Sequence, residues 1–283
     1  MMLSLFLKFF AFSYFALGGH LQIGGDPKLQ LSTMGTDLSV TGDFELGNLG
    51  DESARDAFPE IQLGQWLWTG EPKNISPNQK NLWQINAKFP FEKLKCTPET
   101  CGLFEFPTQG YFPLRIQRHY QDVNGYRFSS PQVAVVMIGE PSKEALMAAR
   151  VPVLSSKLKV EQSGDEFAGT VEIRNTASHD IKVSVSFHTA NELQVLSPTA
   201  SLTIKPQGIE KTNFGLKNYS ALPGSVYAFF ALLQWEEAGM RNATFASTSV
   251  PIGLPHTTPY FLYLAALSLV IGLGLFWFYF KRI

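Results

Sequence analysis

Polar and apolar residues alternate along most of the chain, and this alternation predicts β-strands. The clearest case runs through Ile181, Val183, Val185 and Phe187. A second runs through Phe112, Leu114, Ile116 and Tyr120, with Arg118 as its one exception. Alternation of this kind is typical of a strand with one buried face, and no long helical pattern interrupts it in the body of the chain.

Turn residues separate the predicted strands. Asn124 and Gly125 lie between two alternating segments, which is the commonest short signal for a β-hairpin. The 23 glycines and 17 prolines suit a protein rich in turns. Strands that recur roughly every 8–12 residues indicate antiparallel sandwiches.

The body contains an internal repeat. Gly42–Asn48 reappears as Gly169–Asn175, with Gly, Glu and Asn at the same positions. Ile75–Pro77 then matches Ile204–Pro206 in an Ile-x-Pro pattern. The last block pairs Gly110 with Gly224, Gly125 with Gly239, and Ile138-Gly139 with Ile252-Gly253. Three blocks in the same order predict two copies of one domain.

We therefore predict an all-β fold of two tandem immunoglobulin-like β-sandwiches, residues 28–139 and 157–253, joined by a charged linker at 140–156. The glycine, the alternating strand, the Asn-centred turn and the later Ile-x-Pro strand resemble the bacterial and archaeal immunoglobulin-like modules of the CARDB kind. The resemblance spans Lys28–Gly139 and Lys157–Gly253. It implies extracytoplasmic modules that present surfaces for adhesion or for docking other envelope proteins, and it carries no catalytic residues.

The N-terminal segment has the parts of a secretory signal peptide, predicted at residues 1–18. Lys8 precedes a short apolar core at Phe9–Leu17, and small residues follow at the expected cleavage position after Gly18. The alternative is an uncleaved anchor. A spanning helix needs roughly 20 apolar residues, and Lys8 interrupts the stretch that could supply them, so cleavage is favoured.

The C-terminal segment predicts a transmembrane helix at residues 260–280. The run carries no charge and has the length of one bilayer crossing. Aromatic residues gather at both of its edges, and Lys281 and Arg282 follow it, as the positive-inside rule expects of a cytoplasmic end. A buried core helix is the alternative, but it would normally show a polar stripe. We expect a single-pass type I membrane protein with an extracytoplasmic body and a cytoplasmic tail at 281–283.

The first copy carries an insertion at residues 90–109. The offset between the copies falls by 15 residues, from 129 at Ile75/Ile204 to 114 at Gly110/Gly224. Cys96 and Cys101 both lie in this insertion, and in an extracytoplasmic chain they are predicted to form a disulfide bond. So local a bond would stiffen the insertion, either for a function or simply to order a long loop. A redox-active pair is disfavoured because the spacing is not Cys-x-x-Cys.

Three of the five tryptophans lie in the first copy. Trp66 and Trp68 are two residues apart and so share one face of a strand, while Trp83 lies on a later strand. Core packing is one interpretation, because sandwiches need bulky inward residues. The other is a binding surface of exposed aromatic rings for a sugar or a partner protein.

No pattern in the sequence predicts a catalytic, cofactor or metal site. The five histidines are scattered without the spacing of zinc ligands. Asp51 and Glu52 follow a turn sequence and are interpreted as solvated turn residues rather than as paired acids. The net charge of −1 gives no reason to expect binding to nucleic acid. Glycosylation sequons begin at Asn74, Asn218 and Asn242.

These observations lead to a prediction of function. We expect a membrane-anchored extracytoplasmic protein for interaction or assembly, without enzymatic activity, whose partners are other membrane or envelope proteins or surface glycans. The alternative is a carbohydrate-binding or enzyme-accessory protein with a site at the tryptophans and the Cys96–Cys101 loop. A further alternative is a subunit whose transmembrane helix itself packs on partners. Within the body, the first domain is expected to bind and the second to act as a spacer.

Overall fold

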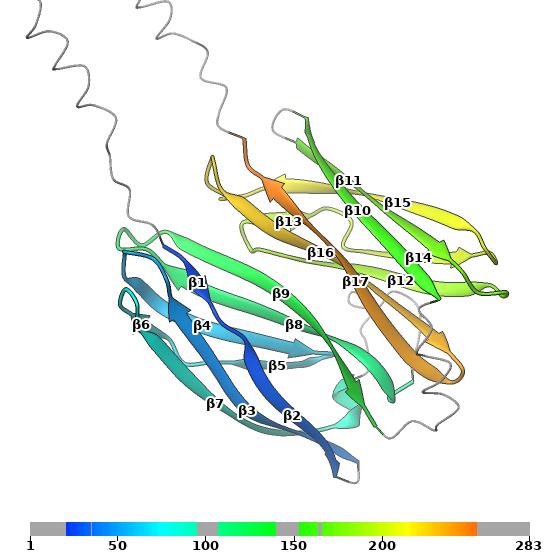
Figure 1. Ribbon diagram of the computed structural model, residues 1–283, viewed down its shortest axis with the longest axis horizontal. Helices are drawn as coiled ribbons and strands as arrows, with labels where there is room; N and C mark the ends of the chain where they lie inside the picture. Colours follow the sequence, from blue (N-terminus) through cyan, green and yellow to red (C-terminus); the bar gives the residue numbers. More distant parts are fainter. Residues whose placement is uncertain (1–20, 35, 95–106, 140–152, 164–165, 254–283) are drawn as a thin grey trace, which may run out of the picture. The chain divides into compact units, whose positions relative to one another are not determined.

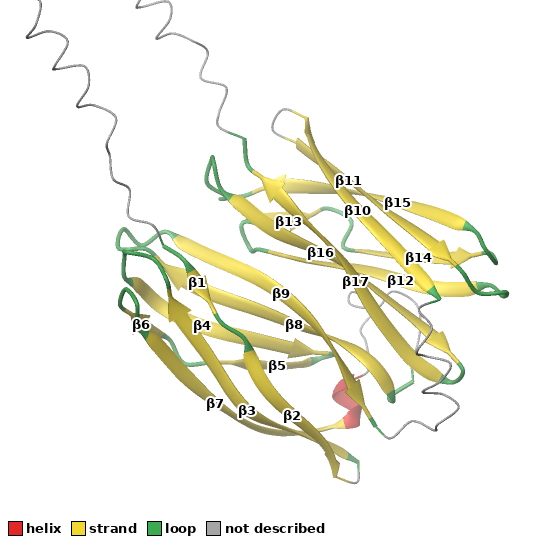
Figure 2. Ribbon diagram, viewed as in Figure 1, coloured by secondary structure: helices red, strands yellow, loops and turns green. Residues whose placement is uncertain are grey.

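The computed structural model describes residues 21–34, 36–94, 107–139, 153–163 and 166–253 (Figure 1). Two compact units are distinguished, one of Met1–Ser220 and Tyr227–Val250, the other of Ala221–Val226 and Pro251–Ile283. The described residues are almost entirely strands and connecting loops, with one short helical turn (Figure 2). The prediction of an all-β fold is confirmed.

Several predicted segments lie outside the described residues. These are the signal peptide at 1–18, the transmembrane helix at 260–280, the tail at 281–283 and most of the linker at 140–156. In the part of the chain that is described, no helix has the length and apolarity needed to cross a membrane. The terminal segments and the exact domain bounds therefore stay predictions.

The first half of the body forms two antiparallel sheets that pack as a sandwich. One sheet contains β1 (Ile23–Gly24), β2 (Pro27–Met34), β3 (Asp37–Asn48) and β7 (Lys80–Pro90). The other contains β4 (Ala54–Leu63), β5 (Trp66–Thr69), β6 (Lys73–Ile75), β8 (Gly110–Gln121) and β9 (Arg127–Ile138). The chain changes sheet after β3, after β6 and after β7. This is the order of an immunoglobulin-like sandwich.

The second half begins and ends in the same order. One sheet contains β10 (Leu154–Ser163), β11 (Glu166–Asn175), β15 (Ile209–Asn218) and β13 (Leu193–Val195). The other side contains β14 (Thr199–Ile204), β12 (Ile181–Thr189), β16 (Val226–Glu237) and β17 (Met240–Pro251). The chain of this half, however, changes sheet after each of β11, β12, β13, β14 and β15. Arg241 of β17 pairs in parallel with Gly110 of β8, so these strands and the second sheet of the first half form one nine-stranded sheet, which the prediction of two separate sandwiches did not include. The halves differ in their middle strands. In the first half β5 and β6 both pair with β4, whereas in the second β13 pairs with β15 and β14 pairs with β12.

Each half has its own apolar core between its sheets. The first includes Leu38, Phe44, Ile61, Phe112 and Ile116, all fully buried. In the second, Val171, Ile173, Val183 and Val185 are fully buried, and the ring of Phe214 stacks on that of Phe229. Full burial of one such side chain contributes about 1.5–3 kcal/mol, so these inward positions supply the main driving force for folding.

A buried asparagine explains why two blocks of the repeat occur together. Asn48 ends β3, and its side chain is fully buried. Its Nδ2 donates to the carbonyl oxygens of Glu52 (2.7 Å) and Ile75 (3.0 Å), and its Oδ1 accepts from the amide of Gly50 (3.0 Å). The asparagine of the first block therefore binds the isoleucine of the Ile-x-Pro block.

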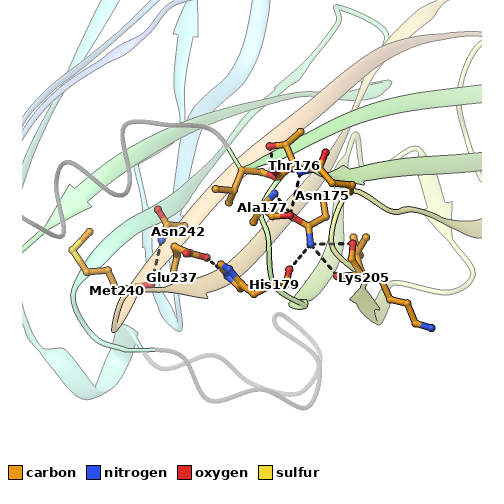
Figure 3. Close-up of polar contacts among 11 residues, drawn as sticks. Asn175, Thr176, Ala177, His179, Lys205, Glu237, Met240 and Asn242 are labelled. Atoms are coloured by element: carbon orange, nitrogen blue, oxygen red, sulfur yellow. Dashed lines mark hydrogen bonds and ion pairs between the residues drawn. The ribbon is translucent and has the colours of Figure 1, made fainter.

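The second copy reproduces this arrangement (Figure 3). Asn175 ends β11, and its Nδ2 donates to the carbonyl oxygens of His179 (2.8 Å) and Lys205 (3.2 Å). It also donates to the carbonyl oxygen of Ile204 (3.0 Å). Its Oδ1 accepts from the amide of Ala177 (2.8 Å). The repeat in the sequence thus preserves a specific set of buried hydrogen bonds as well as a hydrophobic pattern.

The proline of each Ile-x-Pro block lies in a tight turn. Residues Ser76–Gln79 and Lys205–Gly208 each close with a hydrogen bond from the last amide to the first carbonyl, at 3.1 and 2.9 Å. Asn78 and Gln207, which follow the prolines, have positive φ angles of 59° and 56°. Proline followed by a residue of positive φ is typical of a type II turn.

The predicted hairpin at Asn124-Gly125 is confirmed, but its turn is longer than that pair. Strand β8 ends at Gln121 and β9 begins at Arg127. The carboxylate of Asp122 accepts from the amides of Asn124 (2.9 Å) and Tyr126 (2.8 Å), and Gly125 has a φ of 84°. An aspartate that binds the backbone two residues ahead is typical of such turns.

The predicted insertion at 90–109 begins with the helical turn η1 (Phe91–Leu94). Leu94 is fully buried in the first core, and the carbonyl of Lys93 accepts from the amide of Gln65 (2.6 Å). The start of the insertion is therefore fixed to the sandwich. Cys96 and Cys101 lie outside the described residues, and their disulfide stays a prediction.

Candidate binding site

Side chains of strand β12, from the second half of the body, form hydrogen bonds with β8. Arg115 donates from Nη2 to the hydroxyl of Ser186 (2.8 Å). Nε2 of His188 lies 2.9 Å from the carbonyl oxygen of Ile116. Burial lowers the pKa of His188 to about 4, so the ring is neutral at neutral pH and donates this bond. Burial also lowers the pKa of Arg115 to about 10, which leaves the guanidinium charged.

This contact corrects the prediction that β12 has one solvated face. Ser184 and Ser186 occupy the polar positions of the alternation, yet both are buried. The alternation was correctly assigned to a strand, but two of its polar positions are buried rather than solvated. Ser186 accepts its hydrogen bond from a residue 71 positions away in the sequence.

A second set of contacts joins β9 to the loop between β12 and β13. Glu192 in this loop is 3% exposed. Its carboxylate accepts from the amide of Ser129 (2.6 Å) and from the hydroxyl of the same residue (2.6 Å). The hydroxyl oxygen of Ser129 in turn accepts from the amide of Asn191 (2.7 Å). These bonds fix the Glu192 carboxylate in place.

A cavity of about 550 Å³ lies beside this carboxylate. Its lining comes from β4, the ends of β8 and β9, and the loop that holds Glu192. The lining residues are Asp56, Phe58, Pro72, His119, Tyr120, Gln121, Arg127, Phe128, Ser129, Asn191, Glu192 and Ser220. The volume is within the range of about 300–1,000 Å³ that is typical of small-ligand sites.

Two stacked ring pairs form the apolar wall of the cavity. Phe58 stacks on His119 with ring centroids 4.5 Å apart, and Tyr120 stacks on Phe128 at 5.6 Å. Burial, together with the nearby charge of Glu192, raises the pKa of Tyr120 to about 12, so its hydroxyl stays protonated. Burial lowers the pKa of His119, whose ring is therefore neutral at neutral pH.

The three predicted tryptophans pack toward the first core and do not line this cavity. Trp83 is 4% exposed, and its Nε1 donates to the carbonyl of Glu71 (2.7 Å). The Nζ of Lys73 lies 4.6 Å from the centre of its ring. Trp66 stacks on Phe89 at 4.7 Å, and Trp68, like Trp66, is half-buried against the core.

Two loops at one end of the first sandwich expose apolar side chains. Leu49 is 62% exposed in the loop between β3 and β4, and Val123 and Tyr126 are 42% and 59% exposed in the turn between β8 and β9. The carboxylate of Glu52 accepts from the amide of Val123 (3.2 Å), which holds the two loops together. We call Leu49, Val123 and Tyr126 the loop patch.

Comparisons with known proteins show no family for this chain. No protein-family model matches it, and no curated protein matches it. Among solved structures, red sea bream transglutaminase is 12% identical with a TM-score of 0.25, over 80% of this chain and 31% of that one. Salmonella alpha-2-macroglobulin reacted with methylamine is 8% identical with a TM-score of 0.32, over 81% and 16%. The Pseudomonas aeruginosa CupB2 chaperone is 13% identical with a TM-score of 0.26, over 75% and 93%.

The chain spans less than a third of the length of the first two of these proteins. With TM-scores this low, the superpositions carry no argument about function. The description of the fold as immunoglobulin-like rests on the strand order.

No local sequence pattern marks the cavity. Phe58, His119 and Glu192 come from three separate segments, and none of them belongs to a local motif. The available signal was indirect: the predicted hairpin at Asn124-Gly125 joins the strands on which the structure pairs Tyr120 with Phe128. In the described residues, no group of three or more His, Cys, Asp or Glu is placed to hold a metal ion.

Proposed function

We propose that this chain is a membrane-anchored, extracytoplasmic binding protein that docks another membrane or envelope protein through the loop patch. The observation that carries the proposal is the exposure of Leu49, Val123 and Tyr126 on two loops that a hydrogen bond holds together. Single exposed apolar residues are ordinary, whereas a group of them indicates an interaction surface. Tyrosine is enriched among the residues that dominate binding energy.

The rest of the architecture supports this proposal. In immunoglobulin-like domains, the loops at one end of the sandwich commonly carry binding, because the rigid sheets hold them in place. The predicted signal peptide at 1–18 and anchor at 260–280 would place this end outside the cytoplasm. The proposal includes two tandem modules of the CARDB kind at 28–139 and 157–253, and a Cys96–Cys101 disulfide that stiffens the insertion.

The alternative, glycan binding at the tryptophans, has less support. A sugar-binding aromatic surface requires exposed ring faces, but Trp83 is buried and its indole N–H already has an acceptor. Trp66 and Trp68 present their rings largely to the core.

Photocrosslinking tests the docking surface directly. A photoreactive phenylalanine analogue at position 126 of the full-length protein should crosslink a specific membrane or envelope protein in intact cells. The same analogue at Ile209, which is also half exposed but lies on β15, should not crosslink that protein. Leu49→Ser combined with Tyr126→Ser should abolish capture of that protein by the detergent-solubilised chain. Equal crosslinking at both positions, or normal capture by the double variant, would contradict the proposal.

A further inference from the structure

Glu192 is a buried carboxylate without a cationic partner in the described part of the chain. No lysine, arginine or histidine there forms an ion pair with it. Its two hydrogen bonds from Ser129 hold the negative charge in place but do not neutralise it. A buried charge is costly unless it is paired, so a site of this kind favours the arrival of a positive group.

The walls of the cavity suit an organic cation. The rings of Phe58, Tyr120 and Phe128 line it, and the face of an aromatic ring attracts a guanidinium or ammonium group. Such attraction grows when the bound cation loses its contact with water.

The charges of the lining also favour a cation. Asp56 and Glu192 supply two carboxylates, against the single guanidinium of Arg127. Asp56 and Arg127 are both exposed, whereas Glu192 is buried, so the charge on the inner side of the lining is the negative charge of Glu192. His119 adds no positive charge at neutral pH, because burial lowers its pKa.

We propose that this cavity binds a guanidinium or ammonium group, held between the aromatic rings and the carboxylate of Glu192. The source of that group is a lysine or arginine side chain of the docked protein. In this respect the inference rests on the proposed function. The cavity lies next to the loop patch, since Gln121 and Arg127 line it and flank the turn that carries Val123 and Tyr126. One partner could therefore contact both.

Calorimetric titration of the full-length, detergent-solubilised protein tests the site without any partner. The probes are N-acetyl-arginine methylamide, its lysine counterpart, and the citrulline counterpart, which has nearly the same shape as arginine but no charge. Methylguanidinium shows whether a free small cation binds as well as a side chain in a peptide. The arginine probe should bind at least about tenfold more tightly than the citrulline probe, as expected for hydrogen bonds to a charged group.

Two variants and a control identify the residues responsible. Glu192→Gln should weaken arginine binding at least about tenfold. Phe58→Leu should weaken arginine binding about two- to fivefold, because it removes one aromatic ring and leaves the carboxylate in place. This variant still tests the site if Glu192→Gln destabilises the fold. Glu236→Gln, which removes an exposed carboxylate outside the cavity, should not change it. Thermal unfolding of each variant shows whether it is folded.

Several results would overturn the inference. Equal binding of arginine and citrulline probes, unchanged binding in both cavity variants, or tighter binding of N-acetyl-glutamate methylamide would each do so. Methylguanidinium binding more tightly than the blocked arginine would retain the cation site but assign it to a free small amine or guanidine. Probe binding requires no partner, and crosslinking at position 126 requires no probe, so this inference and the proposed function can fail separately.

Discussion

At the scale of single residues, buried amide side chains hold each sandwich together. Asn48 and Asn175 each form hydrogen bonds with backbone groups of the loop that follows their own strand and of the distant Ile-x-Pro segment. A buried carbonyl or amide without a partner costs about 1–3 kcal/mol, so one side chain here prevents several such losses. This is the physical reason for the matching Asn in the two copies.

Replacing one of these asparagines should destabilise the protein strongly. Asn175→Ala would leave the carbonyls of His179 and Ile204 and the amide of Ala177 without their present partner, and we expect a loss of about 3 kcal/mol in the free energy of unfolding. Urea unfolding followed by tryptophan fluorescence measures it. Asn213→Ala, at an exposed asparagine of β15, is the matched control and should cost less than about 0.5 kcal/mol. Similar losses in the two variants would contradict this role of Asn175.

At the scale of elements, the matched glycines of the repeat have different reasons to be glycine. Gly42 has a φ of 149°, and a Cβ there would lie 2.0 Å from the backbone oxygen of Lys28. At Gly169 a Cβ would lie 2.0 Å from the ring of Phe214. The first constraint comes from the backbone and the second from a side chain that packs over the glycine.

Alanine substitutions should separate these two constraints. Gly169→Ala should cost about 1–3 kcal/mol through overpacking, and Phe214→Leu in the same chain should relieve part of that cost, giving a favourable coupling energy. Gly42→Ala should cost more than Gly169→Ala, because no side chain can move to admit the new methyl group. A double-mutant cycle by urea unfolding measures both effects. If the stability changes of Gly169→Ala and Phe214→Leu were additive, the Phe214 ring would not be what excludes a methyl group at position 169.

In the molecule as a whole, the two halves of the body meet through polar contacts, and one of these contacts contains a titratable group, His188. His188 is neutral in the folded protein and faces Arg115, whose charge also lowers the pKa of the imidazole. An ordinary histidine pKa is 6.5, and that of His188 is about 4. Between these values the unfolded chain binds more protons than the folded one, so stability falls as pH decreases through this window.

Acid should therefore weaken the wild-type protein more than a His188→Gln variant, which keeps an N–H donor but cannot titrate. The expected difference between their stability profiles grows as pH falls from 6.5 to 4 and reaches up to about 3 kcal/mol. Urea unfolding at several pH values measures it, and subtraction of the profiles removes groups common to both. Parallel stability profiles of the two proteins between pH 6.5 and 4 would contradict the neutral state assigned to His188 in the folded protein.

The contacts of Glu192 also concern the roles predicted for the two copies. The sequence predicts a first domain that binds and a second that acts as a spacer. The cavity takes Phe58 and Tyr120 from the first half and Glu192 from the second. In the inference above, both halves contribute to one site.

The class of fold and the repeat could be predicted from the amino-acid sequence, because both depend on local patterns. Alternation at Ile181–Phe187 reports a strand wherever its partners lie, and Asn124-Gly125 reports a hairpin between adjacent segments. The matched Asn and Ile-x-Pro blocks were also visible, since each copy had to keep the same buried hydrogen bonds.

Which polar residues are buried, and which side chains contact one another, depends on packing between distant segments. Arg118 breaks the apolar alternation of β8 because its guanidinium donates to the carbonyl of Gly25, a contact across 93 positions. The approach of Ser129 to Glu192 spans 63 positions. Such contacts depend on how strands from distant segments are brought together in the fold. The periodicity of a single strand carries no information about which distant strand packs against it. The cavity could therefore not be predicted from the sequence.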